Sequence, residues 1–220
     1  MLDIERDKTV QIKNRIFYHI HRFGPHSSIW KVGNRINWVR KNKNIFNSFF
    51  DTYRFMTDNT NGNGSKHLLA AIECFRQQAI DFKQAQINDY LEMAYTVIKE
   101  QGMFIRETIF EEVRSSYFPH LPSRKTCIWV FEKEAIEYWW DSLEAQQKFI
   151  LELQLTGSMH HADQKYLVND TLDHDTLRSL AFEYWTGTEG NKSIEEEILF
   201  EGVIDVKRSF ENVDEFKKVI

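Results

Sequence analysis

Two carboxylates near the C-terminal end of the sequence have a spacing that suits chemistry on a sugar. Glu195 and Glu197 stand in the run Ile194–Gly202, where acidic residues lead directly into an apolar segment. If this segment is a strand, residues two apart share a face and lie about 6.5–7 Å apart. Two carboxylates placed in this way can take different roles on one glycosidic bond. A charged run that simply faces solvent is the competing interpretation.

Two histidines form a second pattern. His19 and His21 alternate in the β-favouring run Phe17–Arg22, so their side chains are expected on one face of a strand. Polar residues at a sheet edge would give the same pattern. A metal site needs a third ligand, for which the histidine pair at 160–161 is the other cluster, and without cysteine support we expect no metal.

A third pattern surrounds Arg124. It lies in Leu121–Glu132, just before an aromatic-rich strand, and residues 135–140 then continue as an aromatic-rich helix. A guanidinium at the entry to a buried strand requires an anionic partner. That partner is either a phosphate of a ligand or a carboxylate of the protein itself. Trp139 and Trp140 are expected to pack in the core.

The elements that position these residues are a mixture of strands and helices. Strands are expected at 14–21, 126–131, 149–155, 166–168, 193–201 and 203–207, the last two as a hairpin around Gly202. Helices are expected over 67–100, after Gly102, over 132–143, and from an Asp173 cap to Trp185. Without regular βαβ spacing, this order favours an α+β fold.

Composition indicates one globular domain of 220 residues, of which 42% are hydrophobic. No apolar run reaches the roughly 18 residues that span a bilayer, and the first residues lack a signal-peptide pattern. Two cysteines, Cys74 and Cys127, cannot form a disulfide framework, and Cys127 is expected as a buried free thiol. We therefore expect a cytoplasmic protein without membrane association.

The net charge of −5 hides an asymmetry. Residues 1–66 carry 12 basic and 5 acidic residues (+7), and the remainder carries 16 and 28 (−12). Within 30–54, aromatic residues and Asn alternate with the basic side chains Lys31, Arg35, Arg40, Lys41 and Lys43. This mixture suits phosphate contacts and base stacking on single-stranded nucleic acid, whereas a basic surface over core aromatics is the alternative.

Five short motifs follow one another along the chain. They are Tyr18-His19, Glu111-Glu112-Val113-Arg114, Pro122-Ser123-Arg124, Tyr184-Trp185-Thr186-Gly187 and Glu197-Ile198-Leu199-Phe200-Glu201-Gly202. In this order they resemble a bacterial family of the ADP-ribosyltransferase superfamily. The resemblance covers 15–24 and about 103–208. It implies a split β-sandwich over residues 1–220, with a basic, aromatic segment (27–66) and a helical segment (67–117) inserted after the first strand.

The resemblance also implies roles for individual residues. Glu197 would be the catalytic glutamate, and Glu195 would orient or activate the acceptor. His19 would bind a ribose of NAD, and Trp129 or Tyr138 would stack on nicotinamide; Trp129 stands where the pattern has Tyr. His21, Arg22, Ser123 and Arg124 would complete the NAD site, with Arg124 on the diphosphate.

The function implied is transfer of ADP-ribose from NAD, which is a substrate, without a metal. Together with the basic segment, this predicts a nucleic-acid acceptor, RNA ahead of DNA. The resemblance further implies a toxin restrained by an antitoxin protein, or a component of phage defence. The alternatives are transfer to a protein or small molecule, hydrolysis of NAD, and a non-catalytic binding module on the same fold.

Overall fold

The computed structural model describes residues 10–24, 27–39, 72–74, 76–77, 84–167, 173–187 and 194–220. The strands are β1 (Val10–Arg22), β2 (Arg35–Trp38), β3 (Ile128–Val130), β4 (Lys148–Asp163) and β5 (Glu196–Phe210). The α-helices are α3 (Gln84–Tyr117), α4 (Ile136–Ser142), α5 (His174–Thr186) and α6 (Val213–Val219). Short 3-10 turns are η1 (Ser27–Ile29), η2 (Lys133–Ala135) and η3 (Gln164–Tyr166).

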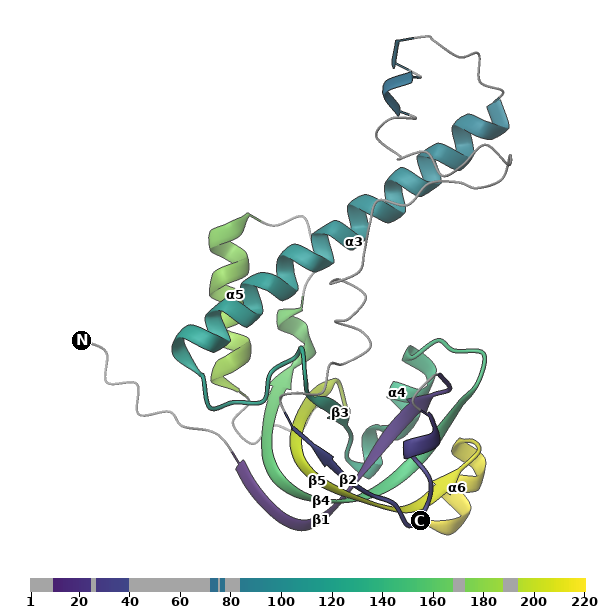
Figure 1. The fold of residues 1–220 in the computed structure, drawn as a ribbon, viewed down its shortest axis with the longest axis vertical. Helices are drawn as coiled ribbons and strands as arrows, with labels where there is room; N and C mark the ends of the chain where they lie inside the picture. Colours follow the sequence, from purple (N-terminus) through teal and green to yellow (C-terminus); the bar gives the residue numbers. More distant parts are fainter. Residues whose placement is uncertain are drawn as a thin grey trace, which may run out of the picture.

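All five strands form one antiparallel sheet in the order β1-β4-β5-β2, and β3 also pairs with β5. The long strands β4 and β5 are strongly bent (Figure 1). Because of this bend, the end of β3 also reaches β1, where Tyr18 and Phe131 exchange two backbone hydrogen bonds of 2.9 and 2.7 Å. The sheet therefore closes on itself through β3.

Two facing glycines permit the close approach of β4 and β5 at the bend. Gly157 and Gly202 are cross-strand partners, with φ of +159° and +153°. A Cβ on Gly202 would lie 2.5 Å from the Thr156 carbonyl oxygen, and one on Gly157 would lie 2.3 Å from that of Glu201. Neither position has room for a larger side chain, so these residues determine where the sheet bends.

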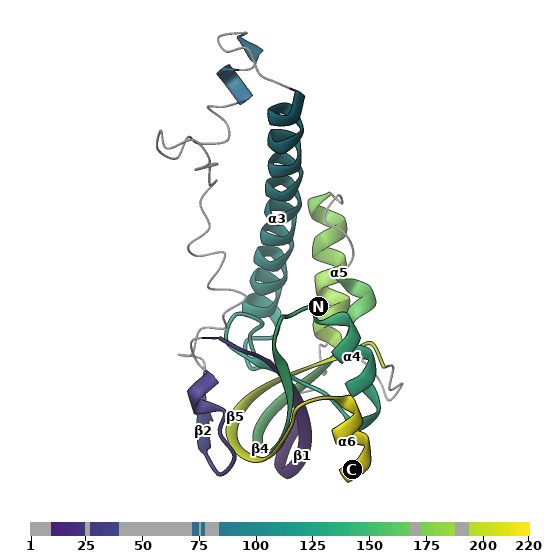
Figure 2. The same ribbon diagram turned by 90° about the vertical axis from the view of Figure 1, so that its right-hand side faces the viewer.

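Three hydrophobic clusters fill the molecule. The first covers one face of the sheet and includes Phe17, Trp30, Leu151 and Phe200. The second lies between the other face and helices α3 and α5, and the third lies under α4 and α6. Figure 2 shows these two pairs of helices at different ends of the bent β4–β5 ribbon. We call the first face inner and the opposite face outer.

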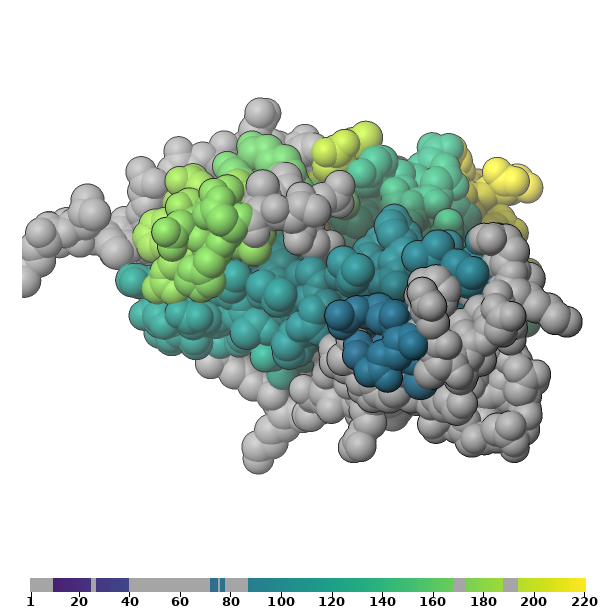
Figure 3. All heavy atoms as spheres, turned by 90° about the horizontal axis from the view of Figure 1, so that it is seen from above, coloured from purple at the N-terminus to yellow at the C-terminus, as the bar shows by residue number. Residues whose placement is uncertain are grey.

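Helix α3 is 34 residues long, and α5 packs only against its C-terminal half, where Phe110 and Trp185 are buried in one cluster. The two helices lie side by side when viewed from above, with α3 in teal and α5 in green (Figure 3). The N-terminal half of α3 extends beyond α5 (Figures 1 and 2). None of the helices in the described ranges is long and apolar enough to cross a membrane.

The structure confirms the α+β class and several of the expected elements. Strands β1, β3 and β4 and helix α4 occupy the predicted segments, with shifted ends. The carboxylate of Asp173 accepts a hydrogen bond from the Thr176 N–H at 3.0 Å, which is the expected cap of α5. Cys127 is a buried free thiol, as predicted, and burial raises its pKa well above the ordinary value.

Several expectations about element boundaries are wrong. The predicted hairpin at Gly202 is one continuous strand, because that glycine faces Gly157 rather than forming a turn. Helix α3 runs through Gly102. A glycine inside a helix costs about 1 kcal/mol, which is small beside the stabilisation that α3 gains from packing Ile109, Phe110 and Val113 in the cluster shared with α5. Tyr166 and Leu167 of the strand expected at 166–168 are not in a strand, because the chain turns in η3, where the Asp163 side chain accepts from the Lys165 N–H; residue 168 lies outside the described part.

Strand β2 and helix α6 were not predicted. They lie inside a segment without clear periodicity and at the chain end, respectively. Of the two segments expected as an insertion, β2 belongs to 27–66 and α3 to 67–117, while residues 40–71 lie outside the described part.

Candidate functional site

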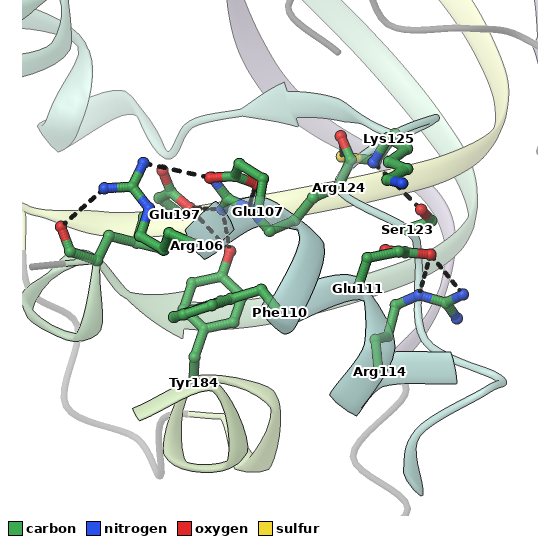
Figure 4. Close-up of polar contacts among 12 residues, drawn as sticks. Arg106, Glu107, Phe110, Glu111, Arg114, Ser123, Arg124, Lys125, Tyr184 and Glu197 are labelled. Atoms are coloured by element: carbon green, nitrogen blue, oxygen red, sulfur yellow. Dashed lines mark hydrogen bonds and ion pairs between the residues drawn. The ribbon is translucent and has the colours of Figure 1, made fainter. Parts of the chain in front are cut away.

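A buried network of charged and polar side chains joins two helices, a strand and a turn around Arg124 (Figure 4). The Arg124 guanidinium donates to Glu107 Oε2 through Nε (2.8 Å) and to Glu107 Oε1 through Nη2 (3.2 Å). Its Nη1 donates to Glu197 Oε2 at 2.5 Å and to the Tyr184 hydroxyl oxygen at 2.6 Å. The Tyr184 hydroxyl donates to the same Glu197 oxygen at 2.8 Å. The site thus fixes one carboxylate oxygen from two directions.

Each member of the network comes from a different segment. Glu107 lies on α3, Tyr184 on α5 and Glu197 on β5, while Arg124 follows the Pro-Ser turn before β3. A further carboxylate, Glu201, fixes that turn by accepting from the Ser123 N–H at 3.3 Å and from the Thr126 hydroxyl at 2.7 Å. The turn therefore aims Arg124 between the helices and the outer face of the sheet.

The electrostatics of the network favour the charged forms. Burial alone would raise the pKa of Glu107, but the charge and hydrogen bonds of Arg124 lower it below the ordinary value. Burial acts to lower the pKa of Arg124, and the neighbouring carboxylates Glu107 and Glu197 raise it well above its ordinary value. Burial raises the pKa of the Tyr184 hydroxyl, which stays protonated and remains a donor.

The second oxygen of Glu197 has no hydrogen-bond partner among the described residues, and the side chain keeps 10% of its surface exposed. The half-buried ring of Trp129 lies on the same outer face, with its centroid 5.6 Å from the Arg124 guanidinium carbon. Trp129 packs against both the α3–α5 cluster and the α4–α6 cluster. An indole ring and a carboxylate are therefore brought to one side of the sheet.

Tyr138 lies near the same end of the β4–β5 ribbon. Its hydroxyl donates to Gln164 Oε1 at 3.4 Å, immediately after the end of β4. Asp163, the residue before Gln164, is the cross-strand partner of Glu196, the neighbour of Glu197. The structure thus brings three of the predicted site residues, Trp129, Tyr138 and Glu197, to the outer face.

His19 and His21 share a strand face, as predicted, with ring centroids 5.9 Å apart. His19 stacks on Trp30 at 5.0 Å, and its Nδ1–H donates to the Trp129 carbonyl oxygen at 2.8 Å. His21 Nε2 lies 2.9 Å from Ser27 Oγ. Burial lowers the pKa of each imidazole to about 4, so both rings are neutral at physiological pH.

The structure does not bring His19 and Glu197 onto one face. His19 pairs with Leu151 of the inner cluster, and Glu197 pairs with Ala162 of the outer cluster under α3 and α5. Strand β3 lies between them: the Trp129 carbonyl contacts His19, while the indole ring lies beside Arg124. The backbone and side chain of one tryptophan separate the two predicted groups.

The predicted pairing of Glu195 with Glu197 on one strand face is also wrong. Strand β5 begins at Glu196, so Glu195 stands in the preceding turn and is exposed. Instead the buried Glu196 contacts His161, with 3.1 Å between Oε2 and Nδ1. Glu195 keeps access to solvent at the start of the strand that carries Glu197.

The other residues predicted for the NAD site and for nucleic-acid binding differ in their exposure. Ser123 is buried, and its hydroxyl accepts from the Lys125 N–H at 3.1 Å. Arg22 is exposed at the end of β1. Lys31 and Arg35 are exposed beside β2, with Arg35 at 3.7 Å from Asp205. Arg40, Lys41 and Lys43 lie outside the described residues.

For Arg124, the structure shows the protein-carboxylate partner that the sequence left open as an alternative to phosphate. Its guanidinium is buried and occupied by Glu107, Glu197 and Tyr184. Sequence reasoning missed Glu107, which has no distinguishing spacing in a long helical pattern. The sequence marks Tyr184 only as part of the Tyr184–Gly187 motif, because its contact with Glu197 depends on the packing of α5.

The described residues contain no group of three or more His, Cys, Asp or Glu side chains that could hold a metal ion. His160, a candidate third ligand for the His19 pair, is buried and stacks on Trp185 at 5.4 Å. Its Nε2–H donates to the Tyr184 carbonyl oxygen at 3.2 Å, and burial lowers its pKa to about 3.

Comparison with known proteins places this architecture in one family. No curated protein matches the chain. A family model described as "Protein of unknown function (DUF2441)" matches residues 17–215, which include every element from the middle of β1 to the start of α6. That span is most of the chain, and the chain therefore belongs to the DUF2441 family.

Proposed function

We propose that this chain is an NAD-dependent ADP-ribosyltransferase in which Glu197 is the catalytic carboxylate. The observation that carries the proposal is the fixed Glu197 side chain. Arg124 and Tyr184 hold Oε2, while the other oxygen has no partner among the described residues. A carboxylate held in this way is pre-organised to accept from a ribose hydroxyl and to stabilise the positive charge of an oxocarbenium-like transition state.

The neighbouring aromatic residues fit the same chemistry. Trp129 and Tyr138 belong to the outer face and offer flat surfaces for a nicotinamide ring. In the reaction, the bond between nicotinamide and C1′ of the ribose breaks, and nicotinamide leaves with the electron pair. The acceptor nucleophile then attacks C1′, and exposed Glu195 takes its proton. Arg124 acts in this proposal as a positioning residue for Glu197 rather than as a diphosphate contact.

The split β-sandwich belongs to the proposal as well. The bend at Gly157 and Gly202 divides the β4–β5 ribbon into two halves, one covered by α3 and α5 and the other by α4 and α6. We extend the proposal to a nucleic-acid acceptor, RNA ahead of DNA, because Lys31 and Arg35 are exposed in the basic part of the chain. A toxin role with an antitoxin partner, or a role in phage defence, rests on the resemblance alone.

A second candidate function is a non-catalytic binding module on the same fold. The position of His19 favours it, because the two residues that would flank NAD lie on opposite faces of the sheet. NAD titration separates the two candidates: the transferase is stabilised against heat by NAD, whereas the binding module shows no shift in melting temperature.

The direct test uses labelled NAD with purified protein and three acceptors: RNA, DNA and a cell lysate. We expect label on nucleic acid, with RNA labelled more than DNA. Label found only on protein would remove the nucleic-acid acceptor from the proposal and leave the transferase. An absence of both label and NAD stabilisation would favour the binding module.

A further inference from the structure

A row of exposed apolar side chains begins in the N-terminal half of α3 and ends just beyond its midpoint. Leu91, Tyr95, Ile98 and Ile105 keep 63, 62, 72 and 45% of their surfaces exposed. Their spacing, with Gly102 included, is four, three, four and three residues, which is the heptad pattern of a coiled-coil seam. The N-terminal half of the helix, which carries Leu91, Tyr95 and Ile98, extends beyond α5 (Figures 1 and 2).

Single exposed apolar residues are ordinary on a protein surface, but four at heptad spacing on one helix form a continuous stripe. The stripe is distinct from the side of the helix that is half-buried, on which Ile87, Ala94 and Val97 lie. It is also distinct from Glu107 and the network around Arg124. The stripe therefore has the form of an interface rather than of core packing.

Charges beside the stripe indicate what covers it. With Tyr95 and Gly102 at a positions and Leu91, Ile98 and Ile105 at d positions, Glu92 and Lys99 are successive e positions. Within one helix they are seven residues, or about 10 Å, apart and cannot pair. Neither side chain makes an ion pair with another residue in the part of the chain that the structure describes.

We propose that α3 pairs with α3 of a second copy of this chain in an antiparallel coiled coil. An antiparallel arrangement places Tyr95 against Ile98 of the partner and Leu91 against Gly102 of the partner. The e positions of the two helices then face each other, so that Glu92 pairs with the partner's Lys99, and Lys99 with the partner's Glu92. One self-complementary surface produces both ion pairs, as a two-fold axis requires.

A parallel pair fits the same residues poorly. It would place Gly102 against Gly102 of the partner, leaving a gap in the seam. It would also set Glu92 and Lys99, at e positions, opposite the preceding g positions of the partner, which are Ile87 and Ala94 and offer no charge. The charge pattern therefore selects the antiparallel arrangement.

A charge exchange tests the proposal in the full-length protein. In sedimentation velocity at low salt, we expect Glu92→Lys or Lys99→Glu to raise the dimer dissociation constant by at least about tenfold. The double variant restores both intermolecular pairs with reversed sign, so we expect it to dimerise like the wild type. Asp89→Lys makes a matched charge change at an exposed position off the stripe, and it should leave the dissociation constant unchanged.

Cysteine pairs test the direction of the helices. In a Cys74→Ser background, we expect oxidation of a mixture of the Leu91→Cys and Gly102→Cys proteins to give the mixed disulfide. Each protein alone should stay unlinked, because its own positions lie 11 residues, or about 16 Å, out of register. A wild type that stays monomeric at its highest soluble concentration, or a double variant that stays dissociated like the single ones, would overturn the proposal.

Discussion

At the scale of residues, the buried charges around Arg124 set the stability of the site as well as its proposed chemistry. The guanidinium is bonded to Glu107 and Glu197, and Arg106 contributes a further contact to Glu107 at 3.3 Å. Two arginines and two glutamates thus balance in charge within the protein interior. Such groups are stable only as a set, because an unpaired buried charge is costly.

Removing one charge from this set should destabilise the protein strongly. We expect Glu107→Gln to lower the free energy of unfolding by about 3–5 kcal/mol, since Arg124 loses its bidentate partner while buried. Glu112→Gln is the matched control on the same helix, because the Glu112 carboxylate pairs with Arg178 at the surface. We expect this substitution to lower the free energy of unfolding by less than about 1 kcal/mol. Urea unfolding compares the two, and equal losses would contradict the buried network.

The neutral histidines predict how stability depends on pH. Burial holds the pKa of His19 and His21 at about 4 and that of His160 at about 3, all below the ordinary 6.5. At a pH between the folded pKa values and 6.5, these histidines bind protons in the unfolded chain but not in the folded protein. The free energy of unfolding therefore rises with pH in this range, and it falls as the pH drops from 6.5 towards 4.

The His160→Phe variant isolates one of these protons. It should reduce the slope of unfolding free energy against pH by up to about 1.4 kcal/mol per pH unit between pH 4 and 6. Chemical unfolding measured at several pH values provides the slope. Curves for variant and wild type that run parallel over this range would show that His160 is not kept neutral by the fold.

At the scale of elements, the bend of the β4–β5 ribbon depends on two glycines. Gly202→Ala should cost about 3 kcal/mol or more, because its Cβ would lie 2.5 Å from a carbonyl oxygen at a positive φ. Gly33→Ala is a useful comparison: its φ is +90°, but a Cβ there meets open space, so only about 1 kcal/mol is expected. If thermal unfolding showed similar losses of stability for both variants, the close approach of β4 and β5 would not be the reason that position 202 requires glycine.

The same glycines show what sequence patterns can and cannot predict. Alternating apolar residues predicted β4, and the Asp173 cap predicted the start of α5, because both signals are local. Gly202 looked like a turn, since its partner Gly157 is 45 residues away and no local pattern connects them. Strand β2 escaped prediction because it is four residues long and is defined only by pairing with β5.

The candidate site, like the fold, was predictable only in part. Glu197, Trp129 and Tyr138 were named from sequence, and the structure brings all three to the outer face. His19 and Glu197 lie on opposite faces of the sheet. This arrangement depends on the strand registers across β4 and on the closure through β3, and the periodicity of the sequence encodes neither of them. Glu107 entered the site through the packing of α3, again without a local signal.

At the scale of the whole molecule, the charge asymmetry gives a test of the proposed nucleic-acid acceptor. Lys31 is exposed next to the aromatic cluster of His19, Trp30 and Trp38. We expect Lys31→Glu to weaken RNA binding and to lower the slope of log affinity against log salt concentration by about 1. Lys218→Glu reverses the charge of another exposed lysine, on α6 and outside the basic part of the chain, and should leave both quantities near wild type.

The central claim is that the Glu197 carboxylate drives transfer of ADP-ribose. The most direct measurement is the rate of label transfer from NAD by the wild type and by Glu197→Gln, each shown to be folded and to bind NAD. The substitution keeps the shape and an oxygen for Arg124 but removes the charge that stabilises the transition state. We predict a loss of at least about a hundredfold in rate with NAD binding retained, whereas full transfer by Glu197→Gln would contradict the assignment.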